Sequence, residues 1–217
     1  CDGSATIEYL GEVRANGPCA DVYTLTRTWR ATDNCGNSST CSQVITVEDN
    51  TPPVITCPAD VTVECDAVPT VGTATATDNC DGTPTIEYLG EVRTDGTCLY
   101  DYTLTRTWRA TDNCGNSSTC SQVITVEDNT PPVCLTRNIT VTVDPVTGTV
   151  NIVAGDIDDG STDNCGSVSL SIDRTSFSCA DAGANIVTLT VEDECGNTSS
   201  CTATVTVNGC ADLELDK

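Results

Sequence analysis

Sixteen cysteines and no histidine set the chemistry available to this chain of 217 residues. Cysteine makes up about 7% of the sequence, close to the level at which small extracellular folds are held together by disulfides. A zinc site would need four thiolates converging in a reducing compartment. The cysteines are instead spread along an acidic chain, so we interpret them as disulfide partners and expect an extracellular or cell-surface, secreted protein.

The absence of histidine also bears on catalysis. It removes the commonest general base and metal ligand, so no Ser-His-Asp, Cys-His or metal-His arrangement can form. Paired carboxylates are frequent, but nothing in the sequence singles out one pair as lying in a pocket. We therefore predict no catalytic residue and expect that the chain is not an enzyme.

Carboxylates are the second abundant chemical group. The chain has 32 Asp and Glu against 9 Lys and Arg, a formal net charge of -23. Such a surface repels nucleic acid and anionic membranes, so we expect neither as a partner. No apolar run approaches the roughly 20 residues of a membrane span. The same carboxylates offer many oxygen ligands to hard cations such as calcium.

The cysteines and acids recur at a fixed interval. The 23 residues "TDNCGNSSTCSQVITVEDNTPPV" of Thr32–Val54 return unchanged at Thr111–Val133, an offset of 79 residues. A third, diverged copy contains "TLTVEDECGNTSSCTATVTV". A fixed period of this length indicates a string of small domains. We predict a partial repeat lacking its first strands, a complete repeat, a diverged repeat, and a tail or the start of a further domain, at residues 1–50, 51–129, 130–208 and 209–217.

Within each repeat the polar and apolar residues alternate with a period of two. In "TLTRTWRAT", Leu104, Trp108 and Ala110 share one face and threonines the other. Thr and Val dominate, and Gly, Asn, Asp and Pro interrupt the pattern every 8 to 12 residues or so. We predict an all-β fold of tandem, disulfide-rich Ig-like β-sandwich domains, arranged as beads on a string. The two Trp residues are assigned to the core.

Two motifs of the second repeat resemble those of the hyalin repeat, an extracellular module with an Ig-like fold. They are "PVITCPADVTV" and "RATDNCGNSSTCSQVITVED". The resemblance covers the second repeat throughout, the third less closely, and the last two thirds of the first. It implies an adhesive or structural role. The version with "TDNC" twice per repeat resembles giant surface or filament proteins of Bacteroidetes-type bacteria, and the tail "CADLELDK" resembles the opening of a different Ig-like repeat. We expect a slice of a longer array.

Six cysteines allow 15 pairings, so spacing alone leaves the connectivity open. A sandwich topology narrows the choice, because a bond must join cysteines at the same end of the sandwich. For the second repeat this predicts Cys57–Cys120, Cys65–Cys98 and Cys80–Cys114. For the third repeat, where Asp144 replaces the equivalent of Cys65, it predicts Cys134–Cys201, Cys165–Cys195 and Cys179–Cys210.

The first repeat lacks its opening strands, so its bonding must differ. We expect Cys1–Cys35, with Cys19 and Cys41 paired outside this chain segment. A half-sandwich leaves an apolar face and a strand edge uncovered. We expect earlier residues of the same protein, or a neighbouring subunit, to complete it head-to-tail. The ten or so residues after Val207 are too few to supply both missing strands, so a simple tail-to-head donor strand is the less favoured version.

The acidic segment "VEDNTPP" lies between repeats and resembles the linkers of cadherins. Calcium takes six to eight oxygens from such groups, whereas Asp and Asn are also common in solvated turns. Both interpretations stay open, and we expect calcium as the one ion the junctions could bind, with no obligatory cofactor. The candidate ligands are Glu48, Asp49, Asn50, Asp78, Asp81 and Asp112 at the first junction, and Glu127, Asp128, Asn129, Asp158, Asp159, Asp163 and Asp193 at the second.

Four asparagines lie in N-x-S/T sequons, which mark candidate glycosylation sites. They are Asn37, Asn116, Asn138 and Asn197. Ser/Thr-rich sequence produces many sequons by chance, so an unmodified turn is the simpler interpretation.

Two functional classes are compatible with this sequence. The first is a structural or adhesive segment of an extracellular filament or cell-surface adhesin, rigidified by disulfides and inter-domain calcium. Its partners would be neighbouring repeats or subunits of the same protein, with glycans or other cells as further candidates. The second is a non-catalytic spacer or carbohydrate-binding module of a secreted enzyme. The near-perfect repeat favours the first.

Overall fold

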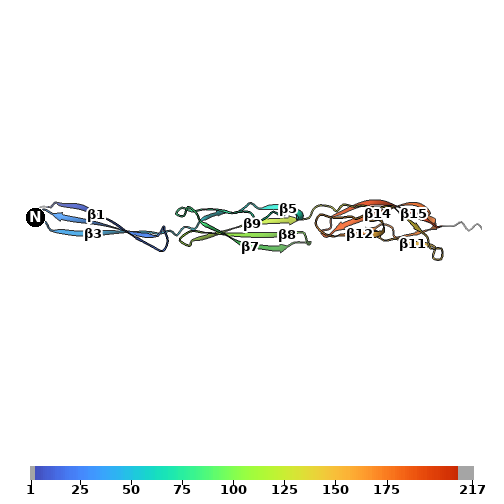
Figure 1. Ribbon diagram of the computed structural model, residues 1–217, viewed down its shortest axis with the longest axis horizontal. Coiled ribbons are helices and arrows are strands. Elements are labelled where there is room, and N and C mark those ends of the chain that lie inside the picture. Colours follow the sequence, from blue (N-terminus) through green and yellow to red (C-terminus); the bar gives the residue numbers. More distant parts are fainter. Residues whose placement is uncertain (1–2, 210–217) are drawn as a thin grey trace, which may run out of the picture. The chain divides into compact units, whose positions relative to one another are not determined.

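The computed structural model describes residues 3–209. Regular structure in this part of the chain is almost entirely β, and its strands form three groups in chain order (Figure 1). The fold class is the predicted one, all-β with tandem Ig-like sandwich domains and disulfides. No helix among the described residues is long and apolar enough to cross a membrane.

The first group is a single antiparallel sheet with the strand order β1-β2-β3. Its strands are β1 (Ala5–Asn16), β2 (Tyr23–Asp33) and β3 (Ser38–Val47). The register of β1 against β2 shifts between Tyr9 and Gly11, where Gly11 has a φ of 123°. A residue with a Cβ rarely adopts this conformation, so glycine permits the bulge.

The second group forms two sheets, with the orders β4-β6 and β5-β9-β8-β7. β5 runs parallel to β9. The elements are β4 (Val54–Thr56), β5 (Val61–Glu64), the 3-10 turn η1 (Cys65–Ala67), β6 (Thr75–Thr77), β7 (Thr85–Asp95), β8 (Tyr102–Thr111) and β9 (Ser117–Glu127).

The third group repeats this plan with the orders β10-β15-β14-β12 and β11-β13, and β10 runs parallel to β15. Its elements are β10 (Ile139–Thr142), β11 (Thr149–Asn151), α1 (Ala154–Ile157), β12 (Val168–Ile172), β13 (Ser176–Ser178), the 3-10 turn η2 (Cys179–Asp181), β14 (Gly183–Asp193) and β15 (Thr198–Asn208).

Contacts between residues divide the chain into two compact units, and the division passes through the second group. The first unit comprises residues 1–59, 71–92 and 105–122, and the second comprises 60–70, 93–104 and 123–217. Strands β8 and β9 contribute to both. The junction between the first two repeats therefore lies inside the first unit, and the next junction lies inside the second. The domain boundaries expected from the repeat remain predictions.

Buried apolar residues alternate with exposed residues along the strands, and the buried ones form the cores. In the third group Val187, Leu189 and Val191 of β14 are fully buried and pack with Val205 of β15 and Phe177 of β13. In the second group Leu104, Ile124 and Val126 form a smaller cluster. Trp108 is 2% exposed, in keeping with its predicted place in the core, whereas the equivalent Trp29 is only half-buried.

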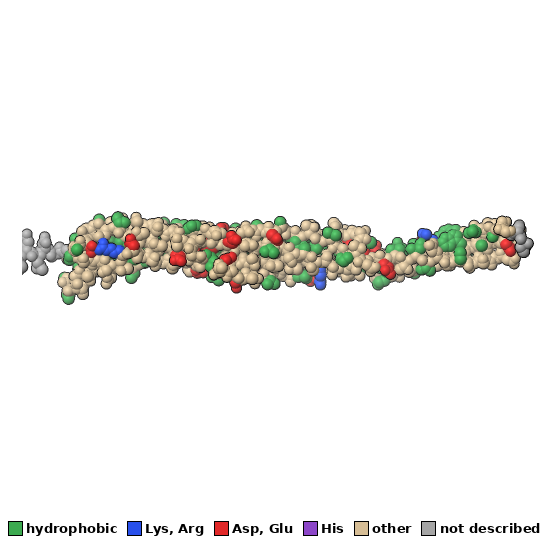
Figure 2. All heavy atoms as spheres, turned by 180° about the vertical axis from the view of Figure 1, so that it is seen from behind, with side chains coloured by type: hydrophobic (Ala, Val, Ile, Leu, Met, Phe, Trp, Pro, Cys, Tyr) green, Lys and Arg blue, Asp and Glu red, His purple; other side chains and the backbone are tan. Residues whose placement is uncertain are grey.

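The first group differs because it has no second sheet among the described residues. Large apolar side chains are exposed on it, including Ile7, Val13 and Val44 at 72%, 69% and 63%. Hydrophobic side chains gather over this group in Figure 2.

The alternation of buried and exposed side chains can be tested on two neighbouring residues of β14. Val187 is fully buried and Ile186 is 65% exposed. Val187→Ala should lower the free energy of unfolding by about 2 kcal/mol, because it removes buried apolar surface and leaves a cavity. Ile186→Ala should change it by less than about 0.5 kcal/mol. Denaturant unfolding of both variants measures the difference, and equal losses would contradict this assignment of faces.

Candidate functional site: the junctions between repeats

Five disulfides join described residues, and two of them lie within single repeats. Cys57–Cys120 and Cys134–Cys201 have Cα–Cα distances of 5.8 Å each. Both are pairs that the sandwich topology predicts. Each ties the start of a repeat to its last strand.

The other three disulfides join consecutive repeats. Cys19–Cys114 lies in the first unit, and Cys65–Cys165 and Cys98–Cys195 lie in the second. Their Cα–Cα distances are 5.1, 5.9 and 5.2 Å, respectively. Cys19 and Cys98 are equivalent residues of successive repeats, as are Cys114 and Cys195. The same bond is therefore made at both junctions.

These bonds correct the expected pairing. Cys65–Cys98, Cys80–Cys114 and Cys165–Cys195 are wrong, and so is the expectation that Cys19 pairs outside this segment. Within one isolated sandwich, cysteines at the same end are the nearest partners, and the expected pairs follow from that. At a junction, however, the loops of two repeats meet, and the nearest partner belongs to the neighbouring repeat.

Four cysteines in the described part of the chain are exposed free thiols: Cys35, Cys41, Cys80 and Cys179. Two expected pairs, Cys1–Cys35 and Cys179–Cys210, include a residue outside the described part of the chain. For Cys41 the expectation of a partner outside this segment stays a prediction.

An asparagine links the two repeats at each junction. The Asn116 side-chain amide donates to the carbonyl oxygen of Asp49 at 3.1 Å, and Asn197 donates to that of Asp128 at 2.9 Å. The backbone N–H groups of these asparagines donate to Asp112 and Asp193 in their own turns. From the sequence both asparagines were expected only as sequons. Their position in the "CGN" turn, repeated next to a junction cysteine, was the available signal.

Buried carboxylates form a cluster at the second junction. Asp128 is 6% exposed and Asp193 8%. Neither oxygen of Asp128 has a hydrogen-bond partner, and one oxygen each of Asp163 and Asp193 is also buried without one. One carboxylate oxygen of Asp128 and one of Asp163 lie within 4.8 Å of each other and of Cys165 Sγ. Because Cys165 is in a disulfide, oxygens are the donors here.

This crowding changes the acidity of Asp128. Burial raises the pKa of its carboxyl above the usual range, and the nearby charges of Asp163 and Asp193 raise it further. A buried, unpaired carboxylate is unfavourable unless it is protonated or neutralised by a cation. The second junction thus has a local excess of negative charge.

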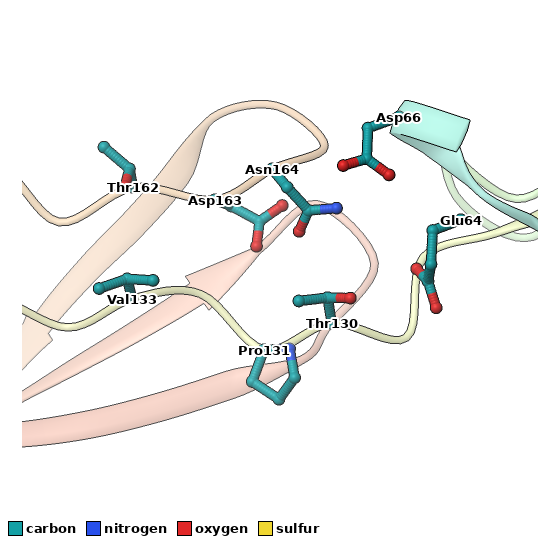
Figure 3. A pocket seen from close by; sticks show the side chains of 8 residues that line it. All are labelled: Glu64, Asp66, Thr130, Pro131, Val133, Thr162, Asp163 and Asn164. Atoms are coloured by element: carbon teal, nitrogen blue, oxygen red, sulfur yellow. The ribbon is translucent and has the colours of Figure 1, made fainter. Parts of the chain in front are cut away.

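An open hollow of about 530 Å³ lies beside this cluster. Glu64 and Asp66, from the end of β5 and η1, line it together with Asp163 and Asn164 and with Thr130 and Pro131 of the connecting segment (Figure 3). Glu64 also accepts a hydrogen bond from the Asn129 backbone N–H at 3.2 Å. Glu64 and Asp66 were not predicted at this junction, because they precede it by more than sixty residues in the sequence.

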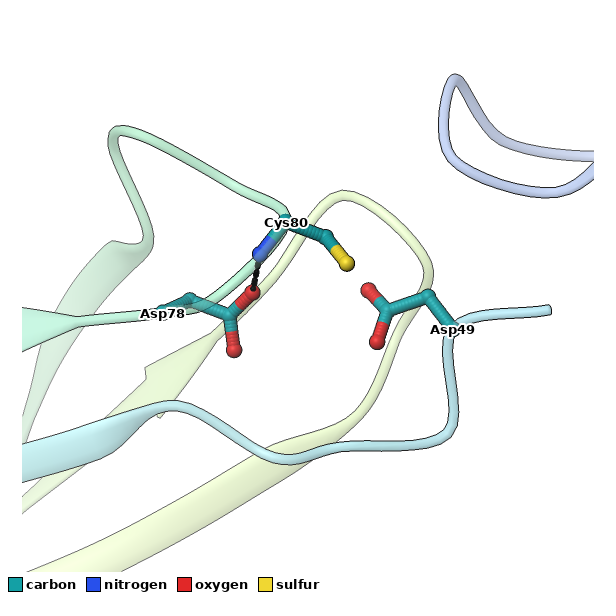
Figure 4. A group of neighbouring side chains, drawn as sticks. All are labelled: Asp49, Asp78 and Cys80. Atoms are coloured by element: carbon teal, nitrogen blue, oxygen red, sulfur yellow. Dashed lines mark hydrogen bonds between the residues drawn. The ribbon is translucent and has the colours of Figure 1, made fainter. Parts of the chain in front are cut away.

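The first junction has an equivalent cluster of Asp49, Asp78 and Cys80 (Figure 4). Asp49 is 5% exposed, and one oxygen each of Asp49 and Asp78 is buried without a hydrogen-bond partner. The other oxygen of Asp78 accepts from the Cys80 backbone N–H at 2.8 Å. Although Cys80 is exposed as a residue, partial desolvation of its thiol raises the pKa, and the charges of Asp49 and other acids raise it further. The protonated thiol leaves oxygens as the available ligands.

The structure brings together only part of the expected ligand set. Asp49, Asp78 and Asp112 meet at the first junction, and Asp128, Asp163 and Asp193 at the second. The remaining candidates take part in local hydrogen bonds. Glu48 and Glu127 accept from Asn50 and Asn129, Asp81 accepts from Thr83, Asp158 accepts from Gly160 and Ser161, and the Asp159 N–H donates to Leu135.

The four sequon asparagines fall into two classes. Asn37 and Asn138 are exposed. Asn116 and Asn197 are half-buried, and their amide nitrogens donate across the junctions. Attachment of a glycan to either of these nitrogens would disturb the junction.

No protein family and no curated protein matches the chain. Among solved structures, human CDH23 EC21-23 is 14% identical with a TM-score of 0.39, and the match covers 94% of this chain and 89% of that one. The human Desmocollin-1 ectodomain is 11% identical with a TM-score of 0.30, covering 96% and 55%. The chain thus spans about half the length of that ectodomain. TM-scores this low establish neither family nor function, so the resemblance to hyalin repeats stays a prediction.

The close packing at the second junction can be tested at two glycines. A Cβ on Gly166 would lie 2.5 Å from Tyr100 Cε2, whereas a Cβ on Gly160 would meet nothing within 4 Å. Both glycines have positive φ, 136° and 89°. Gly166→Ala should therefore destabilise the fold by about 1–3 kcal/mol more than Gly160→Ala, because only the first overpacks the junction. Equal losses in denaturant unfolding would argue against this contact.

The charge cluster predicts an unusual pH dependence in calcium-free buffer. Because the pKa of Asp128 is raised by folding, its carboxyl destabilises the fold above that pKa and has no effect below the unfolded value. Asp128→Asn should raise the melting temperature at pH 7, by about 2–4 °C for each kcal/mol of repulsion removed, and lose this advantage in acid.

Asp158→Asn is the matched control. Hydrogen bonds from Ser161 lower the pKa of Asp158, so its contribution is stabilising above its usual pKa and is lost as the pH falls. This variant should melt at a lower temperature than the parent chain at pH 7. Melting curves in which both variants shift in the same direction would contradict the cluster.

Proposed function

We propose that this chain is a structural and adhesive repeat segment of an extracellular filament or cell-surface adhesin. In this role its repeats act as spacers and contact surfaces rather than as catalysts. Disulfides and calcium hold each repeat to the next.

One observation carries the proposal: the junction between the first and second repeats and the junction between the second and third are built in the same way. A disulfide, an asparagine hydrogen bond and a group of buried aspartates recur at equivalent positions. A binding or catalytic site seldom occurs twice in one chain at a fixed interval. A series of linked domains, in contrast, needs the same connection at every domain boundary. Disulfides persist in oxidising compartments, which supports an extracellular location.

Calcium fits the chemistry of the clusters. At the second junction four buried carboxylate oxygens, from Asp128, Asp163 and Asp193, have no hydrogen-bond partner. Calcium binds through six to eight oxygens and accepts carboxylates, backbone carbonyls and water. Zinc would prefer thiolates, but Cys165 is bonded and the Cys80 pKa is raised. Asp128 and its neighbours would hold the cation, which would neutralise their charge.

The alternative role, a spacer or carbohydrate-binding module of a secreted enzyme, has less support. Carbohydrate binding would be expected to use an exposed aromatic platform. Trp108 is 2% exposed and Trp29 is half-buried, although Tyr9 and Tyr88 are 53% and 40% exposed. Imaging of the native assembly would separate the two roles, because filaments support the first and separate monomers the second.

Calcium titration tests the proposal directly. Calcium at a concentration 100-fold above its dissociation constant should stabilise the fold by about 2.7 kcal/mol, equivalent to about 5–10 °C in melting temperature. EGTA should reverse the shift. Asp128→Asn should reduce it strongly, because that variant removes a central ligand.

Asp158→Asn is again the control, and it should keep the calcium response of the parent chain. An unchanged melting curve at millimolar calcium would overturn the cation site. Equal responses of the two variants would show that calcium acts elsewhere on the acidic surface.

A further inference from the structure

The last strands of the first and second groups have the same sequence but different surroundings. Residues 23–54 and 102–133 are identical, so β3 and β9 share every residue of their aligned parts. Ile124 and Val126 of β9 are fully buried, whereas the equivalent Ile45 and Val47 of β3 are only half-buried. Because the residues are the same, the difference comes from what covers them.

Part of the missing cover can be identified from the other two groups, in which a further strand pairs with the last strand. β5 pairs in parallel with β9, placing Val61 beside Ile124 and Val63 beside Val126. β10 pairs in the same way with β15, placing Ile139 beside Val205 and Val141 beside Val207. In the sheet β1-β2-β3 the corresponding edge of β3 has no strand among the described residues. An open edge of this kind accepts an added strand.

β5 and β10, called the covering strands below, are each held to the last strand of their repeat by two further interactions. An upstream cysteine bonds to the last strand, as Cys57 does to Cys120 and Cys134 to Cys201. The residue before the strand accepts a backbone hydrogen bond from the last strand. Asp60 accepts from the Val123 N–H, and Asn138 from the Thr204 N–H, both at 2.7 Å. On β3 the equivalent positions are Cys41, an exposed thiol, and Val44.

The covering strands therefore share a sequence pattern. It consists of a cysteine, then Asp or Asn directly before two apolar residues that are separated by one position. The patterns are "CPADVTV" from Cys57 and "CLTRNITV" from Cys134. The segment after the third group, "CADLELD", has the same order, with Cys210, Asp212, Leu213 and Leu215. Its cysteine stands three residues before the first apolar position, against four and five in the other two.

The position of this segment in the chain indicates where it binds. Each covering strand follows the last strand of one repeat and covers the next repeat. The segment at 210–216 follows β15, the last strand of the third repeat. The first repeat has no such strand among the described residues, and residues 210–216 of a second copy have the sequence pattern of one.

We infer that residues 210–216 of one copy bind as a parallel strand along β3 of a second copy. Leu213 and Leu215 cover Ile45 and Val47, and Asp212 accepts from the Val44 N–H. Cys210 and Cys41 then form a disulfide, in place of the pair Cys179–Cys210 expected from the sequence. A disulfide oxidant such as oxidised glutathione takes the two electrons and two protons, so that its own S–S bond breaks to two thiols as the new one forms. The head-to-tail contact is heterologous and repeats along a filament.

This inference deepens the proposed structural role and rests on it, but it has a separate test. Gly209 stands where Asp49 and Asp128 stand at the internal junctions. The contact between copies lacks that buried carboxylate, so association should persist in EGTA. The calcium response reports on the internal junctions instead.

The test uses the 217-residue chain, of 22.6 kDa, under oxidising conditions. Light scattering should find species at multiples of this mass that grow with concentration. Leu213→Asp combined with Leu215→Asp should weaken association at least about 10-fold, because charge replaces both apolar contacts. The control Ala211→Ser with Glu214→Ser, in the same segment, should associate like the parent chain. A synthetic peptide, CADLELDK, should cap the chains and reduce their mean mass.

Peptide mapping without reduction should find Cys210 of one copy bonded to Cys41 of another. Cys41→Ser should still associate, but its assemblies should separate in detergent without reductant. A chain that stays at 22.6 kDa at every concentration would overturn the inference, whether its Cys41 is free or bonded to its own Cys210. So would a closed dimer unaffected by the Leu213 and Leu215 changes, because that would indicate face-to-face pairing of two open sheets.

Discussion

The covalent joint between neighbouring repeats is the interaction on which the rest of this structure depends. A repeat of about 79 residues with few aromatic side chains buries little apolar surface, so its core contributes little stability. The bonds Cys19–Cys114, Cys65–Cys165 and Cys98–Cys195 close loops of 95 to 100 residues. In the chain-entropy model each such closure contributes about 4–5 kcal/mol. The junctions thus stabilise the repeats as well as connecting them.

The joint also brings like charges together. By holding the turns of two repeats in contact, the disulfides and the asparagine bonds bury Asp49 at one junction and Asp128 at the other. Isolated carboxylates in such a position oppose folding. A bound cation would turn this cost into a further link between repeats, so one set of residues would provide both the rigidity of the joint and its response to calcium.

Much of this follows from the sequence, because strand patterns and the repeat are local signals. The alternation around Trp108 and the identity of residues 23–54 and 102–133 are sufficient to predict sandwich repeats. The bonds within a repeat also follow, since Cys57 and Cys120 are fixed by strand order. The bonds between repeats do not, because Cys65 could reach Cys98 or Cys165 depending on how two domains meet. The same limit explains why Asp158 and Asp159 were grouped with Asp128, why Glu64 was missed, and why Asn197 was noted only as a sequon.

Disulfide mapping of the oxidised chain tests the central claim most directly. Digestion without reduction, followed by mass spectrometry, should recover peptides in which Cys65 is joined to Cys165 and Cys98 to Cys195. Reduction of the sample should release both pairs. Recovery of Cys65 bonded to Cys98, with Cys165 bonded to Cys195, would mean that each repeat closes on itself, and it would contradict the covalent joint.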